Sequence, residues 1–409
     1  MEVLYPRCGG LDVHKDTVVA CARIVTETGV EQDVASFGTT TSALLKLSDW
    51  LERHGVTHVA MEATGSYWKP VWHVLEPSFE LVLANAMHIK NVPGRKTDVN
   101  DAMWIADLLA HGLIRGSFVP PTNVQELRAL TRTRKQLVRE RSAHVQRIEK
   151  VLQDANLKIT SALSDIVGQS GRAVLRAIIA GETDPERLLA AIGKRRLKAT
   201  RRQLLEALRG RITQHHRFLL KLHLQQVDSL DRAIATIEAE VGEVLRPFRA
   251  AADLLSTIPG VSDVAASVIV AEIGVEMARF PTAGHLVSWA GLCPKSDESA
   301  GKRRSTRIRK GAPWLKTTLV QCAWAAVRTK DSYLRGQFLR LKSRRGPRKA
   351  IVAVAASMLT AAYFMLRNNT AYDDLGFDYF DRRDRLKAAA RLVRRLQHLG
   401  YEVDLREAA

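Results

Sequence analysis

Four acidic residues lie where an α/β sheet would bring them together. Asp12 ends the first β-rich run and Glu62 ends a later one. Asp98 and Asp101 are spaced i, i+3 on the helical segment that follows, so both side chains project from one face about one turn apart. Carboxylate oxygens are hard ligands for Mg²⁺, and two such ions would stabilise the attacking and leaving oxygens at a scissile phosphate. Taken singly, each acid is more readily explained by a structural role, and Asp98 and Asp101 could cap or solvate a helix start. Glu62 fits this alternative least well, because it interrupts an apolar strand.

A helical hairpin is a second candidate site. Residues 256–274 predict a short helix ending at Ile258, the turn Pro259-Gly260-Val261, and a second helix to Ile273. Gly260 would let backbone N–H groups approach a phosphate, aided by the N-terminus of the second helix. The pattern favours a helix-hairpin-helix element that binds DNA backbone at Gly260 and Val261. An ordinary hairpin with a Pro-Gly turn is the alternative.

A serine followed by cations is the third candidate. Ser299 lies in a segment of small residues that predicts a flexible loop. A serine hydroxyl is a weak nucleophile unless a base or nearby cations activate it and the phosphate is held in line. By composition alone, a phosphate-binding loop without covalent chemistry is the simpler interpretation. The predicted phosphate-binding cations of this segment are Lys302, Arg303, Arg304, Arg307, Arg309 and Lys310.

The charge balance points to a polyanionic partner. The chain has 409 residues, with 62 Lys and Arg against 43 Asp and Glu, which gives a formal net charge of +19. Such a surplus attracts nucleic acid or an acidic membrane surface whatever the fold. The four cysteines lack the spacing of a disulfide framework or a zinc ribbon, which favours a reduced cytosol. The uncharged stretch 350–366 falls short of the ~20 residues that a bilayer needs, so we expect a buried core helix.

The first hundred residues predict the elements that would position the acids. Three strands are followed by a helix, a strand, a helix and a strand, which is typical of a mixed α/β sheet of the ribonuclease H type. In such a sheet the first strand is central and the strand after the first helix lies beside it, so Asp12 and Glu62 would be neighbours. The first predicted strand ends at 11–13, and the other four cover 18–25, 34–37, 57–61 and 80–84. The predicted helices cover 41–54, 67–75 and 97–111.

The remainder of the chain predicts helices. Residues 124–152 contain neither Pro nor Gly and repeat apolar residues at seven-residue steps, which predicts a long helix in an antiparallel or dimeric coiled coil. Its other face is strongly basic and is expected to bind nucleic acid, with Arg132, Arg134, Lys135 and Arg139 as candidates. Residues 157–247 continue as helices, and one tail helix is predicted over 381–399.

Taken together, the motifs resemble the one-ten family of bacterial insertion-sequence transposases. Its three acidic motifs are matched by Leu11-Asp12-Val13-His14-Lys15, by Glu62-Ala63-Thr64-Gly65-Ser66-Tyr67 and by Lys96-Thr97-Asp98-Val99-Asn100-Asp101-Ala102. Its C-terminal domain is matched by Ile258-Pro259-Gly260-Val261, Trp289-Ala290-Gly291-Leu292-Cys293-Pro294, Ser299-Ala300-Gly301-Lys302, and Arg309-Lys310-Gly311 with Trp314-Leu315-Lys316. The resemblance spans nearly the whole chain, including the tail motif at 374–378.

The resemblance implies a RuvC-like nuclease domain with a DEDD metal site, and a nucleophilic serine in a C-terminal domain. The implied ligands of Mg²⁺, for which Mn²⁺ can substitute, are Asp12, Glu62, Asp98 and Asp101. Ser299 is the implied nucleophile, with Ser296 and Ser305 as alternatives. The implied domains are a nuclease domain at 1–120, a coiled-coil region at 121–250, a mainly helical transposase domain at 251–370 and a helical tail at 371–409.

The resemblance further implies how such a protein works. A homodimer or homotetramer with composite active sites would recombine donor and target DNA. A non-coding bridge RNA from the element itself would guide the reaction, and no membrane is expected as a partner. One alternative from the residues themselves is a metal-dependent endonuclease or junction resolvase that uses water. Another is a non-enzymatic nucleic-acid-binding protein, against which stand the acids retained within a very basic chain.

Overall fold

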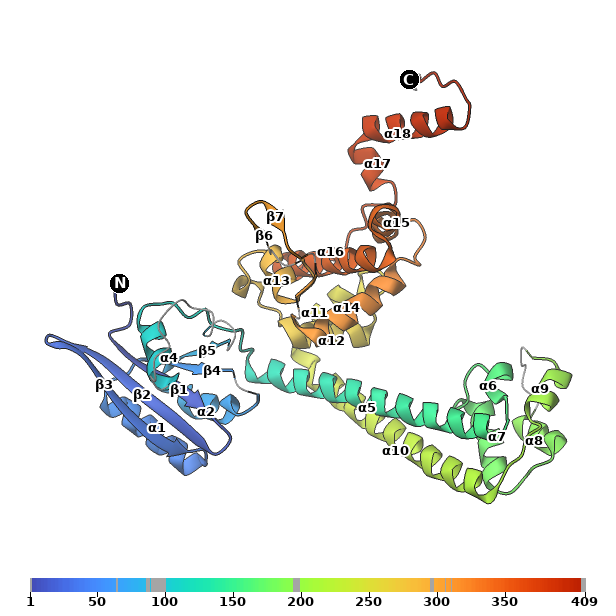
Figure 1. Ribbon diagram of the computed structural model, residues 1–409, viewed down its shortest axis with the longest axis horizontal. Coiled ribbons are helices and arrows are strands. Elements are labelled where there is room, and N and C mark those ends of the chain that lie inside the picture. Colours follow the sequence, from blue (N-terminus) through green and yellow to red (C-terminus); the bar gives the residue numbers. More distant parts are fainter. Residues whose placement is uncertain are drawn as a thin grey trace. The chain divides into compact units, whose positions relative to one another are not determined.

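The computed structural model of the chain describes residues 2–63, 65–85, 89, 101–193, 199–294, 298–305, 307–309 and 311–405, with only the backbone of Ser299 and Arg303. The chain divides into two compact units, Met1–Val119 and Pro120–Ala409 (Figure 1).

A five-stranded mixed sheet forms the centre of the first unit. The strands are β1 (Arg7–Val13), β2 (Thr17–Thr26), β3 (Gly29–Gly38), β4 (His58–Glu62) and β5 (Glu80–Ala84). Their order across the sheet is β3-β2-β1-β4-β5, with β1 antiparallel to β2 and parallel to β4, and with β4 parallel to β5. The predicted mixed sheet with a central first strand is confirmed. Its assignment to the ribonuclease H type stays a prediction.

Helices cover both faces of this sheet. They are α1 (Thr41–Arg53), α2 (Trp68–Leu75) and α4 (Asp101–Ala110). Because side chains alternate along a strand, β1 serves two apolar clusters. Leu11 packs with Leu51 of α1 and Leu75 of α2 on one face. Cys8 packs with Leu109 of α4 on the other. The sheet is therefore fixed between helices on either side.

The second unit begins with a long antiparallel helical hairpin. Its helices are α5 (Thr122–Asp154) and α10 (Gln214–Val244). Arg134, in the first half of α5, pairs with Glu238 in the last third of α10, whereas Asp154 at the end of α5 pairs with His216 near the start of α10. These pairs show that the two helices lie side by side in opposite directions, as Figure 1 shows.

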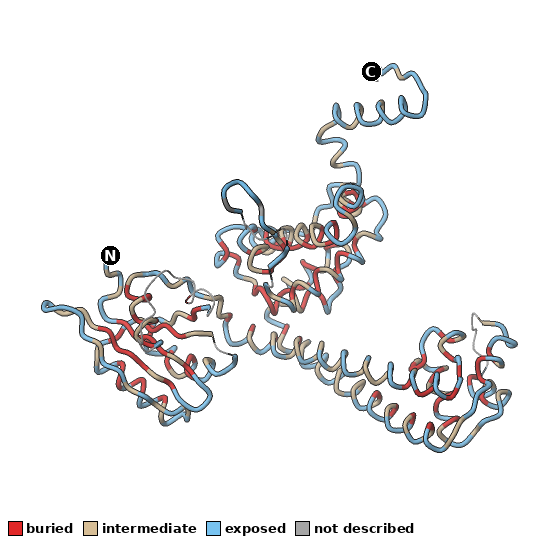
Figure 2. Tube along the Cα trace, viewed as in Figure 1, coloured by how far each residue is buried: buried red, intermediate tan, exposed pale blue. Residues whose placement is uncertain are grey.

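A small helical head closes the far end of this hairpin. Its helices are α6 (Ile159–Ala162), α7 (Gln169–Ile179), α8 (Pro185–Ile192) and α9 (Arg201–Ala207). The head has an apolar core in which Leu175 and Leu188 pack with Leu152 of α5 and Leu220 of α10. Figure 2 shows the buried residues gathered there and sparse along the hairpin. The helical structure predicted for residues 157–247 is confirmed.

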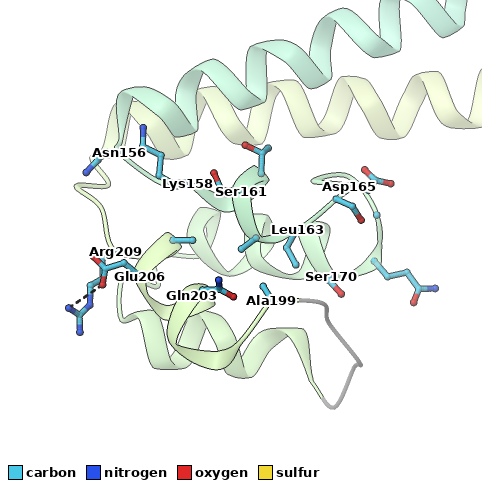
Figure 3. A pocket seen from close by; sticks show the side chains of 16 residues that line it. Asn156, Lys158, Ser161, Leu163, Asp165, Ser170, Ala199, Gln203, Glu206 and Arg209 are labelled. Atoms are coloured by element: carbon cyan, nitrogen blue, oxygen red, sulfur yellow. Dashed lines mark ion pairs between the residues drawn. The ribbon is translucent and has the colours of Figure 1, made fainter. Parts of the chain in front are cut away.

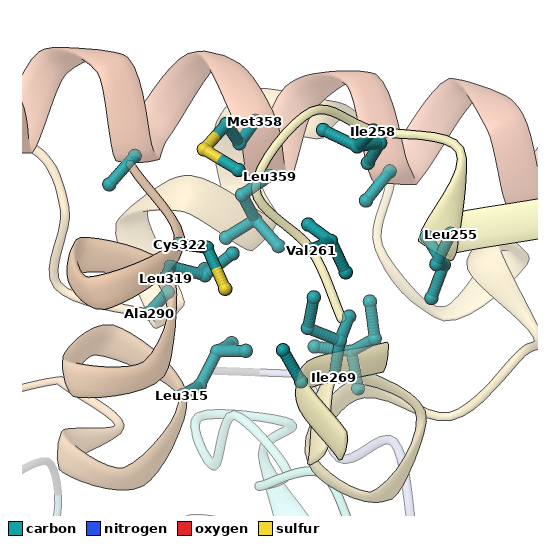
Figure 4. Close-up of a cluster of buried hydrophobic side chains, with 14 of the residues drawn as sticks. Leu255, Ile258, Val261, Ile269, Ala290, Leu315, Leu319, Cys322, Met358 and Leu359 are labelled. Atoms are coloured by element: carbon teal, nitrogen blue, oxygen red, sulfur yellow. The ribbon is translucent and has the colours of Figure 1, made fainter. Parts of the chain in front are cut away.

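A second apolar core holds the C-terminal helices together. The elements are the 3₁₀ helices η1 (Arg246–Phe248) and η2 (Met277–Arg279), the strands β6 (Glu298–Ser299) and β7 (Lys302–Arg303), and the helices α11 (Arg249–Ser256), α12 (Asp263–Ile273), α13 (Ala283–Trp289), α14 (Pro313–Ala326), α15 (Tyr333–Arg345) and α16 (Pro347–Asn368). Val261, Ile269, Leu319 and Met358 converge in this core (Figure 4).

Helix α16 contains the uncharged stretch of the sequence. By length and composition alone it could cross a membrane, with a mean hydropathy of 1.7 over its most apolar window. Its residues Ile351, Val354, Met358 and Leu359 are nevertheless buried within the C-terminal core. The hydroxyl of Tyr363 donates a hydrogen bond to the carbonyl oxygen of Phe280 at 3.0 Å. The prediction of a buried core helix is confirmed.

The tail contains two helices instead of one. They are α17 (Tyr379–Arg383) and α18 (Arg385–His398). The prediction of a single helix over 381–399 is wrong, because Asp384 takes a non-helical conformation with φ −141° and ψ 65°. Its carboxylate accepts a hydrogen bond from the backbone N–H of Lys387 and so begins a new helix, a role for which aspartate is well suited.

Two histidines face each other within the helical hairpin. The Nδ1 atoms of His144 in α5 and His223 in α10 lie 3.3 Å apart. Burial, followed by the charges of His144 and Arg147, lowers the pKa of His223 below its ordinary value of 6.5. The folded hairpin therefore favours the neutral form of His223.

We predict that His223 makes the protein less stable in mild acid. Below pH 6.5 the unfolded chain binds a proton at this position more readily than the folded chain, so the free energy of unfolding falls as the pH falls. Melting temperatures measured at about pH 7.5 and about pH 5.5 should drop more for the wild type than for His223→Gln, which cannot titrate in this range. Equal drops would contradict the prediction.

Candidate functional site

Helix α4 crosses β1 at a glycine. A Cβ atom at Gly10 would lie 2.2 Å from the carbonyl oxygen of Ala102 and 2.4 Å from the backbone nitrogen of Ala106, so only glycine permits this approach. One turn later in α4, the carbonyl oxygen of Ala106 accepts a hydrogen bond from the Cys8 thiol at 3.5 Å. The helix therefore runs back along the strand, and its first residue lies toward the carboxyl end of β1.

Three of the predicted acids lie at this end of the sheet. The adjacent parallel strands β1 and β4 are paired at Leu11 and Met61. Asp12 and Glu62 each follow that pair by one residue and share the face that α4 covers. Asp101 is the first residue of α4. The fold thus places Asp12, Glu62 and Asp101 at the same end of one sheet face, as the sequence predicted for the first two.

A histidine of the first acidic motif, to which the sequence interpretation gave no role, adjoins this group. The Nε2 atom of His14 lies 3.2 Å from Oδ2 of Asp12, and the two side chains are 58% and 21% exposed. The spacing i, i+2 on an extended segment puts both residues on one face, and that spacing was the available signal. The imidazole can donate a hydrogen bond to the carboxylate.

The chemistry of these acids fits a hard divalent cation, because carboxylate oxygens are the preferred ligands of Mg²⁺. Asp98, the fourth predicted ligand, lies outside the described residues. Within the described part of the chain, no three His, Cys, Asp or Glu side chains come together closely enough to hold a metal ion. The metal site stays a prediction, and Asp12, Glu62 and Asp101 are its described members.

The predicted nucleophile lies in a short β-hairpin of the second unit. Strands β6 and β7 pair Ser299 with Lys302 across the turn Ala300-Gly301. Both turn residues have positive φ, 50° at Ala300 and 72° at Gly301, as a two-residue hairpin turn requires. The prediction of a flexible loop is therefore wrong at Ser299, because pairing of the two strands fixes the backbone there. Ser296, one of the two alternative nucleophiles, lies outside the described residues.

Exposed cations surround this hairpin. Lys302, Arg304, Arg307 and Arg309 are exposed, and no described carboxylate lies within ion-pair distance of them. The other alternative nucleophile, Ser305, accepts a hydrogen bond from the backbone N–H of Arg307 at 3.2 Å. Arg303 contributes its backbone to β7, and Lys310 lies outside the described residues. This segment has the charge needed to attract phosphate, and its function stays a prediction.

The predicted helix-hairpin-helix segment contains two helices and a tight turn. The first helix ends at Ser256, two residues earlier than predicted, and Gly260 has a φ of 82°. A Cβ at Gly260 would lie 2.4 Å from the carbonyl oxygen of Cys322 in α14, and Val261 is buried. The structure therefore explains Gly260 by its close packing on α14. DNA binding by this turn stays a prediction.

Two of the predicted nucleic-acid-binding arginines, Arg132 and Arg134, are engaged within the protein, and so is their neighbour Arg128. Glu272 of α12 is only 1% exposed, and its two carboxylate oxygens each accept a hydrogen bond from Arg132 of α5 at 2.8 Å. Arg128 donates to the backbone carbonyl oxygens of Ala271 and Glu272 at the end of α12, at 2.9 and 2.8 Å. Arg134 pairs with Glu238. Internal contacts therefore engage part of this face, and nucleic-acid binding by its residues stays a prediction.

The remaining two candidates of the basic face, Lys135 and Arg139, lie beside an aromatic ring. Lys135 Nζ lies 5.6 Å and the Arg139 guanidinium 5.3 Å from the centroid of the Trp314 ring in α14. Arg132 lies 5.7 Å from the same ring. Cations gather on an indole face because of its negative quadrupole. A sequence pattern could not reveal this cluster, because Trp314 is remote from α5 in the chain.

The helical head encloses a cavity of about 1020 Å³ (Figure 3). Hydroxyl and amide side chains line much of it, among them Ser161, Ser170 and Gln203. Its charged lining residues are Lys158, Asp165, Glu206 and Arg209. Among the described lining residues, two cations and two acids balance one another.

Two transposase family models match the chain. One, described as "Transposase", matches residues 9–157, which include all four predicted acids. The other, described as "Transposase IS116/IS110/IS902 family", matches residues 252–338, which include the α11–α12 turn and Ser299.

Proteins of several insertion elements are similar to the chain. The "Transposase for insertion sequence element IS1111A" of Coxiella burnetii is 25% identical over 77% of this chain and 79% of its own length. The 42 kDa protein of insertion element IS900 from Mycobacterium paratuberculosis is 27% identical over 71% and 80%, respectively. The 44.8 kDa protein of insertion element IS116 from Streptomyces clavuligerus is 26% identical over 58% and 66%.

We predict that the Arg132–Glu272 pair is a major source of stability in the second unit. Arg132→Ala leaves the buried Glu272 carboxylate without its closest partner and should lower the free energy of unfolding by about 3 kcal/mol. Arg187 is 77% exposed and pairs only at the surface, so Arg187→Ala should cost less than about 1 kcal/mol. Denaturant titration of both variants measures the difference. Similar losses in the two would refute the assignment.

Proposed function

Because the chain belongs to the IS110 family of transposases, enzymes that cleave and rejoin DNA, we propose that its reaction uses a carboxylate metal site in the first unit and a serine nucleophile in the second. The observation that carries the proposal is the placement of Asp12, Glu62 and Asp101 at one end of a sheet face. Acids retained together in a chain with a formal charge of +19 are best explained by bound cations.

The proposed metal ligands are Asp12, Glu62, Asp98 and Asp101, and the proposed ion is Mg²⁺, for which Mn²⁺ can substitute. When bound, two such ions would stabilise negative charge on the oxygens of the reacting phosphate. His14 would hold the Asp12 carboxylate in place from its position 3.2 Å away. A RuvC-like, ribonuclease H-type sheet is the fold that we propose for this domain.

Ser299 is the proposed nucleophile. Its oxygen would form a bond to phosphorus while the bond from phosphorus to the leaving sugar oxygen breaks, and the serine proton would be passed to solvent or a base. The phosphodiester energy would be kept in a phosphoserine, so the reverse attack by a sugar hydroxyl rejoins DNA without ATP. Pairing of Ser299 with Lys302 in the hairpin supports this role, because it fixes the nucleophile's backbone beside a cation.

We propose that the protein acts in the cytoplasm, on the nucleoid, as a homodimer or homotetramer with composite sites. Its charge surplus would hold donor DNA, target DNA and a bridge RNA by their phosphates, while base pairing to the RNA selects the sequence. The helical hairpin with its basic face and the α11–α12 turn are the proposed backbone-binding elements.

The nucleophile is tested by trapping a covalent protein–DNA adduct. With Mg²⁺, substrate DNA and the RNA transcribed from the flanking DNA, the wild type and Ser305→Ala should form an adduct on a denaturing gel, whereas Ser299→Ala should form none because the attacking oxygen is missing. Asp12→Asn should abolish cleavage itself. An adduct that persists in Ser299→Ala would overturn the assignment of Ser299 as the nucleophile. Cleavage by Ser299→Ala without any adduct would favour a resolvase that uses water.

RNA guidance is tested separately. We expect RNA transcribed from DNA flanking the gene to copurify with the protein, and ribonuclease treatment to abolish recombination while leaving the melting temperature unchanged. Changing the RNA segment that matches the target should redirect insertion. Recombination at an unchanged site after ribonuclease treatment would refute guidance.

A further inference from the structure

A second cavity lies where α5 meets α12 and α14. Its volume is about 420 Å³. Three cations line it, Arg134, Lys135 and Arg139, and no Asp or Glu is among its described lining residues. This contrasts with the cavity of the helical head, which is larger but balanced in charge. A cavity lined by cations without acids favours an anion.

Lys135 is the unusual member of this lining. Its Nζ atom is buried, and it has no hydrogen-bond partner among the residues that the structure describes. Burial and the neighbouring Arg139 both lower its pKa. The Trp314 ring, 5.6 Å away, compensates only part of the lost hydration. Buried charges are normally paired, so an anion in the cavity would stabilise this ammonium.

The nearby acids are already engaged elsewhere. Glu272 accepts two hydrogen bonds from Arg132. Asp263, in the first turn of α12, lies outside the cavity lining and accepts a hydrogen bond from the Ser256 hydroxyl at 3.4 Å. Arg134 is paired with Glu238 on α10. Glu272 still attracts Lys135 at longer range, but neither Lys135 nor Arg139 forms an ion pair among the described residues.

The cavity also adjoins the start of α12. Ser262 caps this helix, because its hydroxyl accepts a hydrogen bond from the backbone N–H of Ala265 at 3.4 Å. Ser262, Val264 and Ala265 line the cavity, and so does Gly260 in the turn before the helix. The positive end of a helix dipole attracts anions. Two independent features, the unpaired ammonium and the helix start, thus point into one cavity.

We propose that this cavity binds one backbone phosphate of a nucleic acid, with Lys135 as its counter-charge and Arg139 at its side. The basic face of α5 and the α11–α12 turn are far apart in the sequence. In this proposal they form a single phosphate site. The proposal rests on the proposed function only in taking a nucleic acid as the ligand. The phosphodiester of DNA and that of RNA share this chemistry.

The proposal is tested by the salt dependence of binding. Affinities of the full chain for a DNA duplex and for an RNA hairpin with the same number of phosphates are measured by fluorescence anisotropy, in EDTA so that no cleavage occurs. The logarithm of the binding constant falls as the logarithm of the salt concentration rises. Removing one phosphate contact makes this negative slope shallower by about 0.9 for duplex DNA and by about 0.7 for a single strand. For duplex DNA this is a loss of about eightfold at ~0.1 M salt that vanishes toward ~1 M.

Lys135→Gln should make the salt-dependence slope shallower with at least one of the two ligands. The ligand that shows this change is then the nucleic acid whose phosphate binds in the cavity. Lys150→Gln is the matched control, because it removes the same charge from an exposed position of the same helix, and its slope should equal that of the wild type. A slope unchanged in Lys135→Gln for both ligands would overturn the proposal, and so would equal changes in the two variants.

Thermal unfolding separates this site from a structural role. Lys135→Gln should melt no lower than the wild type, because it removes a desolvated, unpaired charge. A lower melting temperature together with an unchanged slope would show that Lys135 serves packing instead. Failure of the serine chemistry would leave these binding results untouched, since no bond is broken in the assay.

Discussion

The buried carboxylate of Glu272 fixes the geometry of the second unit. It belongs to α12, a helix whose other side chains are mostly apolar and buried, so its charge must be balanced where it stands. Arg132 does this with two hydrogen bonds, and Arg128 adds contacts to the last carbonyl oxygens of the same helix. The start of the long helix α5 is thereby bound to the C-terminal core. Together with the apolar packing of Leu127 in the same core, these contacts fix the start of α5 against α12.

Several elements were predictable because local patterns determine them. The alternating apolar runs of the first unit gave its strands to within a few residues, and the absence of Pro and Gly from 124–152 gave α5. Predicted boundaries were wrong where a single residue decides the backbone. Asp384 can continue a helix or cap one, and only its contact with Lys387 selects the cap. Likewise, the hairpin at Ser299 depends on pairing across a turn, which composition does not encode.

The candidate sites were predictable to different degrees. Asp12 and Glu62 followed from the order of strands, because neighbouring parallel strands bring their carboxyl ends together. The use of Arg132 for an internal ion pair was not predictable, since Glu272 is far from it in sequence and reads as an ordinary helical acid. For the same reason the indole of Trp314 beside Lys135 emerged only from the packing of α14 on α5. Charge patterns identify cations, and packing decides which of them remain available.

The 33 residues of α5 also act as a measure of length. At 1.5 Å per residue this helix extends for about 50 Å, close to the rise of 15 base pairs at ~3.4 Å each. Its two ends belong to different apolar cores, one in the head and one around α12. Leu127 is the α5 residue in the C-terminal core and Ile148 is the first buried α5 residue in the core of the head, so the two cores lie about 30 Å apart along the helix. The length of α5 therefore sets the separation of the two cores, and removing residues from it would also shift its ion pairs with α10, such as that of Arg134 with Glu238.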